Sequence, residues 1–498
     1  MRIRDLFRAV ASTLLLLALA GAPASAAVPA GMGPEGRVFT LVGGDELPRE
    51  GLPAHKLRVQ GALVRGMWPA ALPGGEIALV AGRPRQPWLV GMDGRLHALP
   101  ALRGVTRLAA AQDGTLLAVQ HERTIHRLAP RAAAWDLLLD PRRVVADWGP
   151  DWEVEGLATL PGGGYAFWSP DTSIWRVDPG GAPVEIPLAE GDPVTAVAGL
   201  PSGDLVVAID DERLDLIARD GGIRRFAPGT MAFGLAALPD GDVLRAGVTL
   251  DLLGAGGGRL ARIGRGPGLG PGDGGPARRA RLLAYSVAAA PDGTVVASEF
   301  GDKGFDRIAV RMRDGSVIDV PLLTDGFTAG LRVFAPPATA RPLAAVARGT
   351  YRSLPRGRVT VRSTFAGHAT VVVRRAGREI ARAEADVPAG RSTIALAAAP
   401  PAADLTVSLE VTGAGGRAAG GRLEVSALPR LTRRAALALA GVIEESFGGV
   451  ADCRRTGRRR FVCEQPLRDP VTGNCTALIE ITQRADGRTA IMDPESCA

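Results

Sequence analysis

A phrase made of an apolar run, a glycine turn and a second apolar run recurs along the first two thirds of this 498-residue chain. In residues 287–299 (VAAAPDGTVVASE), two apolar runs flank Pro-Asp-Gly. Asp-Gly supplies the positive φ angles of a tight hairpin turn, so the phrase predicts two antiparallel strands. Six copies occur, 38 to 52 residues apart, with turn glycines Gly75, Gly114, Gly163, Gly203, Gly241 and Gly293. This period is typical of a β-propeller with about four strands per blade.

Most copies continue with a second pair of strands. An Ile- or Leu-centred segment follows the hairpin, for example at residues 124–128, 173–177 and 213–217. In the last copy we expect residues 306–310 to be the third strand, closed by a turn at Asp314-Gly315. Six units predict six blades between about residues 37 and 323. Because a blade cannot bury both of its faces alone, the ring must close, and we expect residues 37–42 to complete the last blade.

One stretch also carries a family resemblance. It contains GDGGPA at residues 272–277, SVA at 286–288 and PDGT at 291–294, and a weaker copy begins at Phe39. This pattern resembles the blades of NHL-repeat propellers. Two positions differ from the family, because Asp306 replaces an Asn and Glu299 replaces an Asp. The resemblance implies a six-bladed propeller that serves mostly in binding. Related six-bladed propellers include metal-dependent lactonases and lyases.

In such propellers, ligands bind at the mouth of the central channel. Counting back from each turn along the innermost strand gives five candidate channel residues: Trp68, Arg107, Glu155, Phe233 and Tyr285. This row of positions holds one carboxylate, and none of the five histidines falls on it. A hard metal needs several oxygen ligands, and zinc prefers His and Cys, so we predict neither a catalytic residue nor a metal site.

The candidate channel residues allow two interpretations. Glu155 and Arg107 could pair across the channel to meet a ligand, or they could form a structural ion pair. The three aromatic residues could form a ligand platform or a plug that packs against neighbouring blades. No cofactor is predicted. Ca²⁺ is an alternative at two acidic loops, but neither has the spacing of a known calcium loop: Asp210-Asp211-Glu212, and Asp147, Asp151, Glu153 and Glu155.

The N-terminus predicts a secretory signal peptide over residues 1–26. Arg2, Arg4 and Arg8 precede an apolar run at residues 10–20, and Ala-Ser-Ala at 24–26 predicts cleavage between Ala26 and Ala27. An uncleaved anchor is the alternative. No later apolar run reaches the roughly 18 residues of a membrane span. We therefore expect a bacterial protein that is secreted or held in the cell envelope.

The chain carries a net charge of +7, almost all of it from Arg. These arginines are dispersed and no aromatic-and-basic platform accompanies them, so nucleic-acid binding is not predicted.

Two further domains are expected after a propeller domain that we place at residues 27–333. Residues 334–347, which include FAPPATARP, are rich in Pro and Ala and predict a semi-rigid linker. Short alternating strands between Gly and Pro turns over residues 348–428 predict an antiparallel β-sandwich. It resembles the Ig-like and fibronectin-III-like modules that serve as spacers in bacterial surface proteins.

Residues 429–498 predict a small α+β domain. A helix is expected over residues 431–447, and strands over 459–463, 475–483 and 488–492. All four cysteines of the chain fall here, which predicts two disulfides in an exported domain. Three pairings are open, and we favour Cys453–Cys463 with Cys475–Cys497. A zinc site is the alternative, but no C-x-x-C spacing supports it.

The sequence therefore predicts a mainly β protein: a six-bladed propeller, a β-sandwich and a disulfide-stapled α+β domain. The main hypothesis is a binding or scaffolding protein of the envelope that uses the propeller surface to hold a protein or glycan partner. One alternative is an extracellular metal-dependent hydrolase or lyase of the lactonase-like group. Another is a structural surface spacer.

Overall fold

The structure is a computed structural model of the chain. It describes residues 28–492 except 34, 45, 59–67, 146–147, 149–151, 170–172, 189–192, 210–212, 228–231, 248, 264–273, 281–283, 291, 303–306, 312–316, 322–326, 337–338, 348–349, 402, 404, 426–451, 458–459, 470–472 and 484–488. Several expectations lie outside the described residues: the signal peptide with its cleavage site at Ala26 and Ala27, the helix at 431–447, most of both acidic loops, and Cys497.

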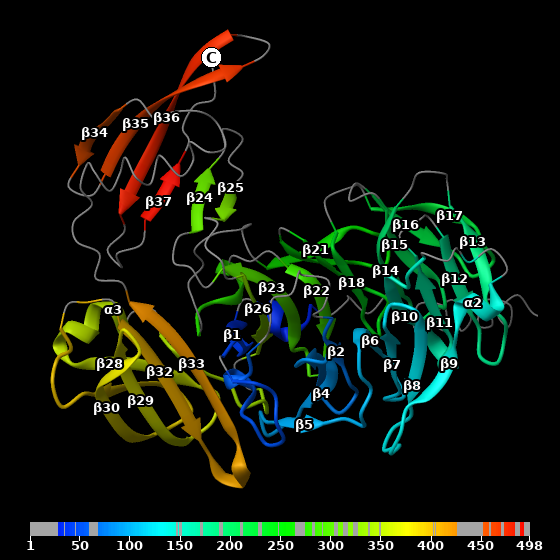
Figure 1. The fold of residues 1–498 in the computed structure, drawn as a ribbon, viewed down its shortest axis with the longest axis horizontal. Helices are drawn as coiled ribbons and strands as arrows, with labels where there is room; N and C mark the ends of the chain where they lie inside the picture. Colours follow the sequence, from blue (N-terminus) through cyan, green and yellow to red (C-terminus); the bar gives the residue numbers. More distant parts are fainter. Residues whose placement is uncertain are drawn as a thin grey trace, which may run out of the picture.

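Residues 70–263 form five four-stranded antiparallel sheets, each built from four consecutive strands (Figure 1). At the end of the first strand of each sheet, and again in residues 284–302, the turn glycine predicted from sequence has a φ of +79° to +91°. The strands are β2 (Ala70–Ala71), β3 (Ile77–Ala81), β4 (Gln86–Val90), β5 (Leu96–Ala98); β6 (Val105–Ala110), β7 (Leu116–Gln120), β8 (Thr124–Leu128), β9 (Asp136–Leu139); β10 (Gly156–Thr159), β11 (Tyr165–Trp168), β12 (Ser173–Val177), β13 (Val184–Pro187); β14 (Val194–Gly199), β15 (Leu205–Ile209), β16 (Arg213–Ile217), β17 (Ile223–Ala227); β18 (Gly234–Ala237), β19 (Val243–Ala246), β20 (Leu250–Leu253) and β21 (Arg259–Ile263).

The sixth sheet joins the two ends of this region. Its strand order is β1 (Arg37–Val42), β26 (Phe327–Ala335), β23 (Val295–Asp302) and β22 (Ala284–Ala289). The expectation that residues 37–42 complete the last sheet is therefore confirmed. The third strand was predicted wrongly. Residues 307–311 form β24 (Arg307–Arg311), which pairs with β25 (Val317–Pro321) in a separate hairpin.

A physical reason explains that error. Local alternation indicates that a segment is extended, but it does not identify its partner strand. β26 pairs along the whole length of β23 on one side and with β1 on the other, and it buries Val333, Phe334 and Ala335. The inserted β24–β25 hairpin lacks such a place between two strands. The ring thus closes through β26, which lies outside the six copies of the repeated sequence pattern.

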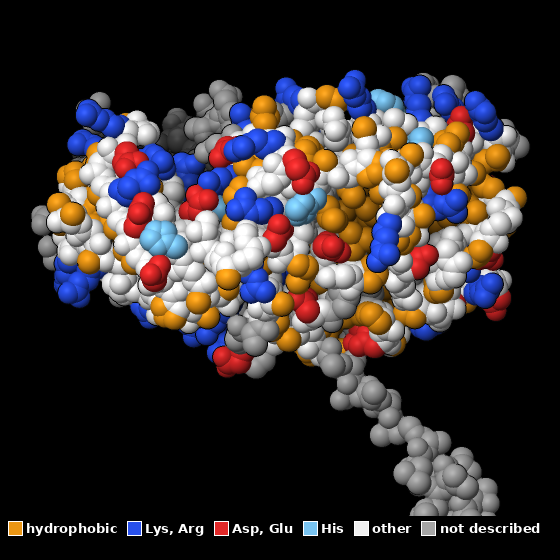
Figure 2. Space-filling view, turned by 90° about the horizontal axis from the view of Figure 1, so that it is seen from below, with side chains coloured by type: hydrophobic (Ala, Val, Ile, Leu, Met, Phe, Trp, Pro, Cys, Tyr) orange, Lys and Arg blue, Asp and Glu red, His pale blue; other side chains and the backbone are white. Residues whose placement is uncertain are grey.

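The sheets follow one another in a propeller-like arrangement. The innermost strands β2, β6, β10, β14, β18 and β22 each contact the next in this order, and β22 contacts β2. Apolar side chains from adjacent sheets form the cores between them: Leu117 of the second sheet, for instance, packs with Phe167 and Trp175 of the third. Basic and acidic side chains are interspersed over the face shown in Figure 2.

Residues 344–425 form two antiparallel sheets that share one apolar core. We call this part the two-sheet domain. One sheet has three strands and the other has four: β27 (Ala344–Val346), β28 (Arg358–Ser363) and β31 (Gly390–Ala395); β30 (Arg378–Val387), β29 (Gly367–Arg375), β32 (Leu405–Thr412) and β33 (Ala418–Val425). A short helix, α3 (Thr350–Ser353), lies between β27 and β28.

The two-sheet domain packs directly on the propeller-like sheets. The Ala418 amide donates to the Asp93 carbonyl at 3.0 Å, and Arg95 Nε donates to the Gly416 carbonyl at 2.8 Å. Leu343 and Ala345 belong to the same core cluster as side chains of β1, β3 and β23. Within the segment expected to be a linker, β26 extends to Ala335 and β27 begins at Ala344. This contact differs from the separation that a spacer module would give.

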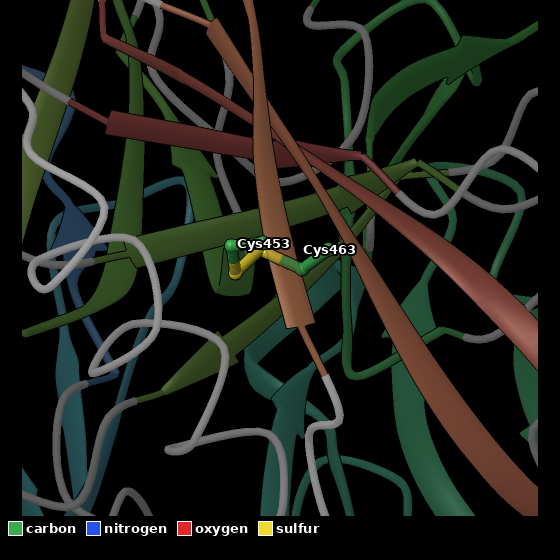
Figure 3. Close-up of a disulfide and its surroundings, with 2 residues drawn as sticks. All are labelled: Cys453 and Cys463. Atoms are coloured by element: carbon green, nitrogen blue, oxygen red, sulfur yellow. A yellow bond between two sulfur atoms is a disulfide. The ribbon is translucent and has the colours of Figure 1, made fainter.

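The last described residues form a four-stranded antiparallel sheet: β34 (Asp452–Gly457), β35 (Arg460–Asp469), β36 (Gly473–Gln483) and β37 (Thr489–Met492). Cys453 and Cys463 lie opposite each other on β34 and β35 and form a disulfide (Figure 3). The favoured Cys453–Cys463 pairing is therefore confirmed. Cys475 lies on β36. β37 contacts β24, which places the inserted hairpin beside this sheet. None of the helices within the described residues has the length and apolar character of a membrane span.

Candidate functional site

The innermost strands share a repeated irregularity at their first residues. In β6, β14 and β22 the register shifts around Thr106, Thr195 and Tyr285. Just before β10, the Glu155 amide donates to the carbonyl of Trp168, which also pairs with Gly156. Just before β18, the Phe233 amide donates in the same way to the carbonyl of Ala246, which also pairs with Gly234. In each case two residues of the innermost strand lie opposite one residue of the neighbouring strand, which defines a β-bulge.

These bulges recur at the start of five successive innermost strands, at the end of the ring opposite the glycine turns. We call Thr106, Glu155, Thr195, Phe233 and Tyr285 the mouth residues. Glu155, Thr195, Phe233 and Tyr285 are half-buried, and Thr106 is buried. Counting back from the turns reaches all five positions, and Glu155, Phe233 and Tyr285 were chosen from them as candidates. The two threonines were not chosen, and a bulge leaves no sequence motif that would have favoured them.

Arg107 holds three sheets together beneath the mouth. Its guanidinium is buried, with Nε donating to the Glu155 carbonyl at 2.6 Å and Nη1 to the Thr106 carbonyl at 3.0 Å. The guanidinium carbon also lies 5.3 Å from the ring centroid of Trp68, which precedes β2. A cation over an indole face is attracted to its negative π-surface. The predicted proximity of Arg107 and Glu155 is found, and it involves the main chain of Glu155.

Phe233 and Tyr285 form a second group. Their rings stack with centroids 4.7 Å apart and planes 16° from parallel. Burial raises the pKa of the Tyr285 hydroxyl, so this group stays protonated at neutral pH. A Cβ at Gly234 would lie 2.7 Å from the Tyr285 carbonyl, so only glycine lets β18 approach β22 this closely. The five sequence candidates therefore divide into two groups, Trp68–Arg107–Glu155 and Phe233–Tyr285.

Thr195 links the fourth sheet to the fifth. Its hydroxyl donates to the Ala232 carbonyl at 3.0 Å, next to Phe233. The backbone ahead of Glu155 is held in a similar way, because the Val154 amide donates to the Glu122 carbonyl at 2.7 Å. Hydrogen bonds between neighbouring sheets thus hold the mouth in place on both sides.

Aromatic residues gather beside this row, between the second and third sheets. Trp148 lies 5.7 Å from Trp152 and 5.0 Å from Trp175 between ring centroids, and Trp175 stacks on Phe167 at 5.4 Å. This cluster packs the segment that leads into Glu155, and sequence reasoning did not identify it. The density of Trp in residues 148–175 was the available indication.

The mouth combines the half-buried carboxylate of Glu155 with the half-buried aromatic rings of Phe233 and Tyr285. Such a surface can stack on an apolar face of a ligand and accept or donate a few directed hydrogen bonds. Within the part of the chain that the structure describes, no group of three or more His, Cys, Asp or Glu side chains is placed to hold a metal ion.

No protein-family model matches the chain, and no curated protein matches it. Solved structures do resemble it. A candidate gluconolactonase has 14% identity and a TM-score of 0.38, and the match covers 61% of this chain and 93% of that one. The WD40 β-propeller domain of Doa1 has 11% identity and a TM-score of 0.32, covering 53% and 94%. An auxiliary nutrient-binding protein from Bacteroides ovatus has 13% identity and a TM-score of 0.39, covering 53% and 74%. Identities and TM-scores this low identify neither a family nor a function.

Proposed function

We propose that this chain is an exported binding protein of the bacterial envelope, built on a six-bladed NHL-like β-propeller whose mouth residues form the ligand site. Six four-stranded sheets and the ring of contacts between their innermost strands support the six blades. The shared core of the following two sheets supports an Ig-like sandwich. The Cys453–Cys463 disulfide is compatible with an oxidising compartment and hence with export.

The repeated bulge carries the functional proposal. Bulges re-aim side chains and are frequent beside functional sites, and here the same bulge recurs in five neighbouring strands. Four of these five positions carry half-buried side chains, and the fifth, Thr106, is buried. The resulting row of Glu155, Thr195, Phe233 and Tyr285 has the mixture of aromatic and polar groups that recognises a glycan or an extended peptide.

Binding to defined envelope glycans tests this proposal. The mature chain from Ala27 is titrated against soluble peptidoglycan fragments and against neutral and acidic oligosaccharides. We expect one of these probes to bind selectively. Tyr285→Phe keeps the stacked ring and should bind like the parent chain, whereas Tyr285→Ala should weaken binding by up to about tenfold. An unchanged urea unfolding midpoint in both variants shows that the fold is intact. Equal binding by Tyr285→Ala and the parent chain contradicts a site at the mouth.

Metal analysis separates this function from that of a lactonase-like hydrolase. The purified chain is dialysed against metal-free buffer and its metal content is measured. One Ca²⁺, Mn²⁺ or Zn²⁺ retained per chain, and lost in Glu155→Gln, would favour the enzyme and overturn the binding proposal. A spacer protein, in contrast, would bind none of the glycans and would be unaffected by substitutions at the mouth.

A further inference from the structure

β30 forms a free edge of the two-sheet domain. Its sheet has the order β30-β29-β32-β33, and among the described strands β30 pairs only with β29. The opposite edge, β33, contacts η2 (Ala54–Lys56) of the propeller-like part, so the β30 edge points away from it (Figure 1). Six side chains of this ten-residue strand are exposed: Arg378, Glu379, Ile380, Arg382, Glu384 and Asp386. Since no other described strand pairs with it, an edge of this length presents a row of backbone groups for a further strand.

The charges of β30 are unevenly distributed along the strand. Arg378, Glu379 and Arg382 lie toward its start, for a net charge of +1 from two Arg and one Glu, and Glu384 and Asp386 lie toward its end, for a net charge of −2. Ile380, one of the few exposed large apolar residues in the described chain, lies between the two arginines at 38% exposure. When such a strand meets a second copy in antiparallel orientation, the basic half of each copy faces the acidic half of the other.

We infer that β30 pairs with β30 of a second copy of this chain across a two-fold axis at Ala383. In this register Arg382 of each copy lies opposite Glu384 of the other, and Ala381 lies opposite Ala385. Sliding the strands by two residues in one direction sets Arg382 against Arg382. Sliding them in the other direction sets Glu384 against Glu384. Since like charges directly opposite each other are unfavourable, the charge pattern selects the register centred on Ala383.

The existing contacts of these side chains allow this exchange of partners. Arg382 pairs with Glu379 at 3.0 Å and lies 3.7 Å from Glu384 of the same strand, both at the exposed surface. Glu384 and Asp386 also lie 3.7 and 3.0 Å from His368. Surface ion pairs of this kind contribute little to stability and rearrange at low cost. The two four-stranded sheets would become one continuous sheet of eight strands. The two propeller-like parts, at the far β33 edges, would lie at opposite ends of the dimer.

Sedimentation of the full mature chain, from micromolar to submillimolar concentration, tests the pairing. We expect a monomer–dimer equilibrium that Arg382→Glu weakens by about tenfold, because it creates two like-charged pairs. The double variant Arg382→Glu/Glu384→Arg restores opposite charges and should recover the dimer. A chain that stays monomeric throughout this range, or a double variant no better than Arg382→Glu, overturns the inference.

Crosslinking defines the register independently of those charges. Ala383→Cys places the new thiols next to each other across the two-fold axis, so oxidation should give a disulfide-linked dimer. Ala381→Cys is the matched control, because residue 381 faces residue 385 and should crosslink far more slowly. The intact mass of the non-reduced dimer distinguishes this bond from exchange with the native cysteines. Equal yields from the two variants would overturn the proposed register.

Discussion

Arg107 shows how one side chain can connect neighbouring sheets. It is buried, and it donates to carbonyls at the start of β6 and just before β10. Arg107→Ala would leave the Glu155 carbonyl without this charged donor and would remove the contact with Trp68. We expect a loss of about 2–3 kcal/mol in the free energy of unfolding, measured with urea. Arg103→Ala, at an exposed position in the loop before β6, is the control and should change it by less than about 0.5 kcal/mol. Equal effects would show that Arg107 does not hold the sheets together.

We expect His55 to make the junction between the propeller-like part and the two-sheet domain sensitive to acid. Its ring lines a small cavity with Gly94, Ala418 and Gly420, and its Nδ1 has no hydrogen-bond partner. Burial lowers the pKa of His55 from 6.5 to about 4. Because the folded pKa lies below the unfolded one, the folded state favours the neutral ring. Its stability is therefore complete above pH 6.5 and falls as the pH drops toward 4.

That shift corresponds to a loss of up to about 3 kcal/mol between neutral pH and pH 4. Urea unfolding at the two pH values measures it, and His55→Gln removes the titrating ring. The acid-induced loss should be smaller in His55→Gln than in the parent chain, because all other titrating groups are common to both. The same pH dependence in both proteins would contradict a role for His55. Sequence alone could not foresee this role, because Ala418 and Gly420 lie more than 360 residues from His55.

Secondary-structure elements were predictable where the information is local. All six turn glycines adopt the positive φ that a tight hairpin turn demands, for example in the Gly-Gly pair at Gly75, the Ser-Gly pair at Gly203 and the Asp-Gly pair at Gly241. The same local rule failed for the last sheet, where β24 has the pattern of a third strand while β26 occupies that place. Pairing depends on which strands are already present on each side. The mouth positions followed from counting along the strands, but the bulges that orient them follow from pairing across the sheet.

Gly94 lets the turn between β4 and β5 fit under the two-sheet domain. Its φ is +77°, and a Cβ there would lie 2.3 Å from the Ala418 carbonyl oxygen. Gly51 is a matched control, because its φ of +71° is similar and no atom lies within 4 Å of the added Cβ. Gly51→Ala should cost only the backbone strain, about 1 kcal/mol. Gly94→Ala should lose at least about 2 kcal/mol more in urea unfolding, because the two parts must separate. Similar losses would mean that the contact tolerates displacement.

At the scale of the whole molecule, the ring of sheets is closed by the first strand that the structure describes, β1. β1 pairs with β26, and Phe39, Leu41 and Val42 enter a core shared with the first sheet and the two-sheet domain. Val38 points into the core on the other side, with residues of the fifth and sixth sheets. Cleavage between Ala26 and Ala27, which we predicted from the sequence, would leave this strand intact. Closure therefore couples the two ends of the propeller-like part to the domain that follows it.

Deletion of residues 27–44 tests this coupling. The truncated chain should lose cooperative thermal unfolding, since the last sheet lacks its outer strand and two cores open to water. A synthetic peptide of residues 28–44, added in excess, should restore the cooperative transition by pairing with β26. The same peptide with Phe39→Ala should restore it much less, because truncating a buried Phe costs about 3–5 kcal/mol. If the truncated chain unfolds like the parent without any peptide, the ring does not depend on β1. In that case the contacts made by Leu343 and Ala345 are sufficient to hold the first and last sheets together.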